Sequence, residues 1–214
     1  MDTIIYITAF AIQIVIVIAS ITIHEFSHGY SAYLLGDDTA KRAGRLSLNP
    51  IRHLDPIGAL MLLIVRIGWA KPVPINPYNF KDQKIGTSIT AAAGPASNFI
   101  IAILVAILFR LIQPLSQINI IFYFIVFALQ FTVMINIALG LFNLIPIPPL
   151  DGSKIISGFL SDEMYFRWMQ WEKQGAYLLM LIFGISFFLK IPLFQTVIVP
   201  PLNFFTTLLL GTSI

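Results

Sequence analysis

The sequence of 214 residues contains no cysteine, and only 11% of its residues are charged. Without cysteine, neither disulfide bonds nor metal sites with thiolate ligands can form. Soluble domains are typically about 25% charged, so the scarcity of charge argues against a soluble enzyme. The sequence also lacks an internal repeat, a low-complexity tract and an appended soluble domain. We therefore expect a single membrane-embedded domain over residues 1–214.

What the sequence has in abundance is long apolar runs. Hydrophobic residues make up 57% of the chain, and the mean hydropathy is +0.86. A helix needs roughly 18–20 apolar residues to cross a bilayer. Four uncharged runs approach or exceed that length, at residues 3–23, 89–109, 118–150 and 174–189. They predict an all-α integral membrane protein, a polytopic bundle of four or five transmembrane helices. The first run lacks the basic n-region and the cleavage site of a signal peptide, so we expect it to be retained.

Two apolar stretches fit this pattern less simply. The tail, residues 193–214, is interrupted by two adjacent prolines and could form a fifth span or a kinked segment lying against the bundle. In residues 57–80, an apolar run of nine residues ends at an arginine, and three prolines follow between residues 72 and 77. We interpret 57–80 as a re-entrant segment or β-hairpin. Irregular backbone at membrane depth requires protein or water beside it, so a wet pocket should lie nearby.

Positive charge is concentrated in the polar segments between the apolar runs, at residues 41–52, 71–84 and 154–173. Cytoplasmic loops of membrane proteins collect Lys and Arg. This predicts a multi-pass cell-membrane protein with these segments in the cytoplasm and the N-terminus outside. Four helices would then cross in alternate directions, at about 3–35, 86–112, 118–145 and 174–191. Arg110 and Lys190, near outward ends, are exceptions. Because topology explains the basic segments, nothing indicates binding to nucleic acid.

The most informative motif is HEFSH, residues 24–28, at the end of the first apolar run. In a helix, His24 and His28 lie one turn apart on the same face, where both can reach one zinc ion with Glu25 beside them as general base. Five-residue motifs occur by chance, but ionisable groups in a membrane span are costly and normally serve a site. The alternative is that the histidines lie at the headgroups and bind nothing.

A catalytic zinc typically has a third protein ligand, and several side chains could supply it. His53 and Asp55 could line a cavity or order their loop, and Asp37 and Asp38 follow Gly36 at the expected end of the first helix. Asp151 stands apart, because it follows a proline-broken helix end, NLIPIPPL, and precedes Gly152. Asp151 could alternatively be the N-cap of a helix that starts at Gly152.

In the expected second helix, residues 91–97 form a patch of small side chains around Pro95. Small residues let membrane helices approach closely, so we expect this patch to pack against the first helix. Asn98 follows it as a polar group at membrane depth. It could orient a metal ligand or bridge two helices.

Three of these motifs together resemble the site-2 proteases, which are intramembrane zinc metalloproteases. They are HEFSH, GPASNF at residues 94–99 and NLIPIPPLDG at residues 143–152. The resemblance extends over about residues 18–154, and it is to the compact prokaryotic branch without PDZ or CBS domains. It implies His24, His28 and Asp151 as zinc ligands and Glu25 as the catalytic acid/base. It also implies that Asn143 helps to hold the substrate backbone.

We therefore expect an intramembrane endopeptidase that cuts transmembrane segments of other membrane proteins, in a catalytic core at about 3–155 followed by C-terminal helices at about 156–214. Glu25 would take a proton from a zinc-bound water in a cavity open to the cytoplasm. The substrate would lie extended against the hairpin edge at Val73 and Ile75, although the hairpin could instead be a plug that seals the bundle. A competing hypothesis is a membrane protein that binds or transports metal through the same His24, His28 and Asp151.

Overall fold

The structure is a computed structural model and describes residues 2–65, 68–190 and 192–211. Within these ranges all regular elements are helices, which confirms the all-α prediction. The long ones are α1 (Asp2–Leu34), α4 (Gln83–Ile112), α5 (Ile120–Asn143), α8 (Glu172–Phe188) and α9 (Leu193–Leu210). The short ones are α2 (Thr39–Arg42), η1 (Pro50–Arg52), α3 (Pro56–Val65), η2 (Pro77–Asn79), η3 (Gln113–Gln117), α6 (Asp151–Ser157) and α7 (Asp162–Gln170).

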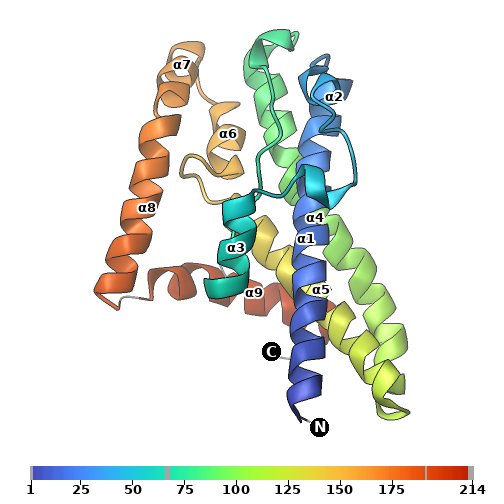
Figure 1. Cartoon of the computed structure of the whole chain (residues 1–214). Coiled ribbons are helices and arrows are strands. Elements are labelled where there is room, and N and C mark those ends of the chain that lie inside the picture. The colour runs from blue at the N-terminus through green and yellow to red at the C-terminus, as the bar shows by residue number, and fades with distance from the viewer. Residues whose placement is uncertain (1, 66–67, 191, 212–214) are drawn as a thin grey trace.

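Three helical stretches are long and apolar enough to cross a membrane, at Thr3–Leu34, Gln83–Gln117 and Ile120–Asn143. They correspond to the first three predicted spans, and α1, α4 and α5 pack against one another. Figure 1 shows α8 standing beside this group, on the far side of α6. These three helices form the frame on which the site is built.

The tail forms one continuous helix, α9, in spite of its two internal prolines. Figure 1 shows α9, in red, running crosswise to α1 and α8 rather than alongside them. Its end packs into an apolar core shared with α4 and α5, which includes Phe109, Val133, Ile137 and Leu210. Arg110 donates hydrogen bonds to the carbonyls of Leu208 and Leu209 at the end of α9. This contact gives a role to Arg110, which was an exception to the rule that positive charge collects in cytoplasmic loops.

The described residues of the segment 57–80, which are 57–65 and 68–80, form no β-hairpin. Its first part is α3, and the described residues after it are extended without forming a strand, apart from one isolated bridge between Leu54 and Ala70. Asp55 accepts a hydrogen bond from the Gly58 N–H at 2.8 Å, and Pro56 is the first helical residue. A side-chain acceptor before a proline is a strong helix start, and it explains why Pro56–Val65 is a helix and not a strand.

Candidate metal centre

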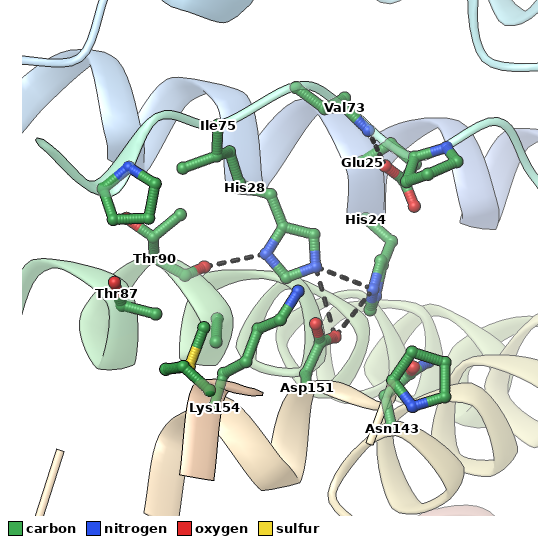
Figure 2. A pocket seen from close by; sticks show the side chains of 15 residues that line it. His24, Glu25, His28, Val73, Ile75, Thr87, Thr90, Asn143, Asp151 and Lys154 are labelled. Atoms are coloured by element: carbon green, nitrogen blue, oxygen red, sulfur yellow. Dashed lines mark hydrogen bonds and ion pairs between the residues drawn. The ribbon is translucent and has the colours of Figure 1, made fainter. Parts of the chain in front are cut away.

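Helix α1 carries His24 and His28 on one face, and their Nε2 atoms are 3.0 Å apart. Asp151, 123 residues further along the chain, brings its Oδ2 atom to 3.1 Å from His24 Nε2 and 3.2 Å from His28 Nε2. Figure 2 shows the three side chains converging on one point. The structure therefore brings together the three residues that the sequence motifs singled out.

The corner between α5 and α6 delivers Asp151 to this point. Helix α5 ends at Asn143, residues 144–150 form turns, and α6 begins at Asp151 itself. Leu150 occupies the N-cap position, so the alternative that Asp151 caps a helix is wrong. A Cβ added at Gly152 would lie 2.2 Å from the Leu144 carbonyl oxygen. Glycine at this position allows the corner to fold tightly enough to bring the carboxylate back to α1.

The spacing of these atoms fits a zinc ion. Zinc ligands lie 2.0–2.1 Å from the metal in a tetrahedral arrangement, so two of them are about 3.3 Å from each other. The three observed separations, 3.0, 3.1 and 3.2 Å, are close to this value. Three protein ligands leave a fourth position for water or substrate.

A chain of hydrogen bonds fixes the orientation of His24. The Asn136 amide nitrogen donates to the Thr132 carbonyl and to Ser20 Oγ, both at 2.9 Å, and the Asn136 amide oxygen accepts from Asn98 at 2.8 Å. The Asn98 oxygen therefore faces His24 Nδ1, at 2.6 Å. Since an amide oxygen can only accept, Nδ1 carries the proton and Nε2 presents its lone pair to the centre.

His28 is oriented in the same way by backbone. Its Nδ1 donates to the Thr90 carbonyl at 2.7 Å, which leaves Nε2 with a lone pair. The two Nε2 atoms and the Asp151 carboxylate thus converge at separations of 3.0–3.2 Å, an arrangement that could hold a metal ion between them. Carboxylate oxygen and imidazole nitrogen are both common ligands of zinc, so the three donor atoms suit this metal.

Gly94 makes room for the two imidazoles. A Cβ at Gly94 would lie 2.4 Å from His28 Nε2 and 2.6 Å from His24 Cε1. The small-residue patch thus has a sharper role than packing against α1, which it also performs. Asn98 has both of the roles that the sequence suggested. It orients a metal ligand, His24, and it bridges helices by connecting α1 through α4 to α5.

A pocket of about 440 Å³ adjoins the three residues. Its lining includes Glu25, Val73, Ile75, Asn143 and Lys154. Glu25 accepts a hydrogen bond from the Val73 N–H at 2.8 Å, so the extended segment lies against the carboxylate next to the metal point. The Asn143 amide donates to the Leu139 carbonyl of its own helix. Figure 2 shows Asn143 and Val73 on opposite sides of the centre.

Two other residues considered as a third metal ligand, His53 and Asp55, do not reach the metal centre. His53 is buried away from the pocket, and its Nε2 donates to the Ser47 carbonyl at 2.6 Å. It orders the basic loop, as Asp55 does by capping α3.

Sequence reasoning missed three residues that surround the centre. Asn136 was a detectable polar residue in an apolar run, Lys154 lies one helical turn after Asp151, and Thr90 acts through its carbonyl, which leaves no side-chain signal.

Comparisons with known proteins agree with this geometry. Residues 115–188 match the profile of Peptidase family M50. YwhC of Bacillus subtilis (strain 168), provisionally named a zinc metalloprotease, is 38% identical over 173 residues, which cover 79% of this chain and 78% of YwhC. Rip2 of Mycolicibacterium smegmatis, named in the same way, is 28% identical over 85% of this chain and 69% of its own. Zinc metalloprotease MJ0392 of Methanocaldococcus jannaschii is 28% identical over 82% of this chain but 43% of its own length. No solved structure matches the chain significantly.

The similarity to YwhC extends over more than three quarters of both chains. The predicted resemblance is thereby confirmed, and the converging His24, His28 and Asp151 form a group positioned to bind the metal that such an enzyme requires. The chain belongs to peptidase family M50, the site-2 proteases, and is a zinc metalloprotease.

Proposed function

We propose that this metalloprotease is an intramembrane endopeptidase, which hydrolyses peptide bonds within or near transmembrane segments of other membrane proteins. One observation carries the proposal: Asp151 converges with His24 and His28 beside Glu25, and the two histidines and Glu25 lie on a helix long enough to cross a membrane. We assign the first three as the zinc ligands and Glu25 as the catalytic acid/base. All of residues 1–214 would form one domain, with the ligands in the core at about 3–155.

We further propose four spans, α1, α4, α5 and α8, with α9 lying across the bundle and α3 dipping into the membrane. Helix α3 is apolar, but its ten residues are too few to cross. Figure 1 shows α2, α7 and the start of α4 at one end of the bundle and the N-terminus at the other. The basic residues of these segments therefore share an end, which supports assigning it to the cytoplasm. Water would reach the pocket from this side.

The residues of the pocket can perform the hydrolysis. Zinc, when bound, would polarise the scissile carbonyl and make water a stronger nucleophile. Glu25, next in sequence to His24, takes the proton of the attacking water and delivers it to the leaving amine nitrogen as the C–N bond breaks. The Val73 N–H holds one oxygen of the Glu25 carboxylate at 2.8 Å, which leaves the other for the proton.

We propose that the substrate is unwound and held extended along residues 72–76, by addition of a strand. Because prolines lack an N–H, only Val73, Ile75 and Asn76 offer one in this segment. Glu25 accepts from Val73, and a second carboxylate accepts from Asn76. The Ile75 N–H has no protein partner among the described residues, and Ile75 lines the pocket. We therefore assign this N–H to the substrate backbone, with Asn143 contacting the substrate from the other side.

A pair of substitutions at Ile75 tests this assignment. Ile75→Pro removes the N–H, and Ile75→Ala shortens the side chain but keeps it. If the N–H binds substrate, Ile75→Pro should lower kcat/KM for a model transmembrane substrate by roughly 10-fold, the value of a lost hydrogen bond, with zinc content unchanged. Ile75→Ala should remain close to wild type. Equal activity of the two variants would contradict the pairing.

The function itself is tested by Glu25→Gln. This change removes the proton acceptor and keeps the shape, so cleavage of a model transmembrane substrate in detergent or liposomes should fall by at least about 100-fold. Zinc measured per chain should stay at the wild-type level, because Glu25 is not among the ligands. Glu163→Gln is the matched control, since Glu163 lies at the surface and pairs with Arg167, at 2.6 Å.

Two results would contradict the proposal. One is a Glu25→Gln variant that cleaves as well as wild type. The other is a wild-type protein that holds zinc but cuts no transmembrane substrate, as expected of a protein that only binds or transports the metal.

A further inference from the structure

Asp37 is a buried carboxylate that the proposed mechanism does not use. It is fully buried, and four donors surround it. Its Oδ1 accepts from the backbone N–H and the hydroxyl of Thr39 and from the Asn79 amide at 2.7 Å, whereas its Oδ2 accepts from the Asn76 N–H at 2.8 Å. Burial acts to raise the pKa of Asp37, but these hydrogen bonds outweigh burial and hold the pKa below its usual range. Asp37 is therefore an anion at neutral pH.

The end of α1 aims this carboxylate at the extended segment. Gly36 has a φ of +105°, its N–H bonds to the Tyr33 carbonyl, and the Asp37 N–H bonds back to the Ala32 carbonyl at 2.9 Å. This is the Schellman arrangement that ends a helix with a left-handed glycine. Asp37 is thus attached rigidly to the helix that carries His24 and Glu25.

The two carboxylates of α1 and its cap hold the same short segment. Glu25 accepts from the Val73 N–H and Asp37 from the Asn76 N–H, each at 2.8 Å. The Ile75 N–H lies between these two anchors. The segment is also held before Val73, where the Lys71 N–H donates to the His53 carbonyl and the Lys71 carbonyl accepts from Arg45. After Val73, however, Asp37 holds the backbone at Asn76, so without Asp37 the part that contains Ile75 would be held at its beginning alone.

We propose that Asp37 is a positioning residue of the peptidase site, which holds Asn76 and Asn79 so that Val73 stays against Glu25 and Ile75 faces the substrate. This inference rests on the proposed function for the role of Ile75. The alternative is that Asp37 only stabilises the turn after α1. The two hypotheses predict different effects at Val73. If Asp37 positions the segment, loss of its carboxylate should disturb the distant Val73 N–H, whereas a role in the turn alone predicts no change there.

The test compares Asp37→Asn with Asp38→Asn. Asp38 is the next residue, but its exposed side chain pairs with Arg42 one turn away, so its variant is the matched control. Residue-resolved hydrogen exchange of the detergent-solubilised protein should show faster exchange at both Asn76 and Val73 in Asp37→Asn, with α4 unchanged. Faster exchange at Asn76 alone, or at neither residue, would overturn the proposal.

Kinetics give a second measurement. Asp37→Asn should lower kcat/KM for the transmembrane substrate by roughly 10- to 100-fold, as misplacement of a reacting group does, with zinc content unchanged. The double variant Asp37→Asn/Asn79→Asp restores a carboxylate–amide pair with the roles exchanged, and should recover most of the loss. If Asp37→Asn folds poorly, Asn79→Ala removes one donor, and it should change exchange at Asn76 and Val73 in the same direction.

The outcomes separate the two proposals. Wild-type protein that cleaves nothing contradicts the proposed function, and the exchange measurement still decides whether Asp37 holds the segment. Wild-type protein that cleaves, together with an Asp37→Asn variant that matches Asp38→Asn in both exchange and kinetics, contradicts the role of Asp37 alone.

Discussion

Two regions of the molecule deliver the three side chains of the metal centre, and they do so by opposite means. Helix α1 is unbroken, and its regular spacing places His24 and His28 one turn apart. The corner between α5 and α6 is instead non-helical over residues 144–150, and these turns bring Asp151 back to the two histidines. The first region depends on local periodicity and the second on a tight turn, so substitutions should damage them differently.

The largest expected effect is at the corner. Gly152→Ala would place a Cβ 2.2 Å from the Leu144 carbonyl oxygen and 2.6 Å from the Ile145 carbonyl oxygen. Because backbone cannot move aside as a side chain can, the corner should open and withdraw Asp151. We expect zinc per chain and proteolysis to fall to background and stability to drop by about 1–3 kcal/mol, as measured by metal analysis and thermal unfolding in detergent.

Gly184→Ala in α8 is the control for this substitution. A Cβ at Gly184 meets no atom within 4 Å, and alanine favours a helix over glycine by up to about 1 kcal/mol. This variant should therefore match or slightly exceed wild type in stability and bind zinc normally. A Gly152→Ala protein that retains full zinc would show that the corner is not as constrained as its geometry indicates.

A smaller effect is expected on the α1 side, where the helix remains intact and only a supporting contact is lost. Asn98→Ala removes the acceptor that orients His24. Loss of such a support typically weakens metal binding by roughly 10- to 100-fold. A competition titration against a zinc chelator measures this change.

Asn136 and Asn203 complete the series. Asn136→Ala leaves the Asn98 oxygen in place but removes the partner that sets the direction of its amide, so its loss of affinity should be smaller than that of Asn98→Ala. Asn203→Ala, exposed on α9, should change nothing. If Asn98→Ala binds zinc as tightly as wild type, the hydrogen-bond chain does not support the centre.

The same contrast explains what could be predicted from sequence. His24, Glu25 and His28 follow from five consecutive residues and helical periodicity, and α1, α4 and α5 follow from the length of apolar runs. Asp151 could be proposed because prolines before it and Gly152 after it mark a broken helix. Each of these signals lies within a short stretch of residues, so it can be recognised from the sequence without the structure.

Features that depend on contacts between distant segments could not be predicted. The Thr90 carbonyl that orients His28 leaves no trace in the side-chain pattern. Asn136 and Asn98 are 38 residues apart, and only packing of α4 on α5 shows that they form one chain of hydrogen bonds. A β-hairpin over 57–80 is not found among the described residues, because the helix start at Asp55 and Pro56 gives the helix α3 where a first strand would lie. Whether α8 is a span also depends on its surroundings, since its apolar length alone is marginal.

The most direct test is X-ray absorption at the zinc edge, with wild type compared with Asp151→Ala. Joint coordination by α1 and the α5–α6 corner predicts two imidazole nitrogens and a carboxylate oxygen at roughly 2.0–2.2 Å from zinc. It also predicts that Asp151→Ala either loses the metal or shows a changed oxygen shell. An Asp151→Ala protein with full zinc and an unaltered spectrum would contradict the account.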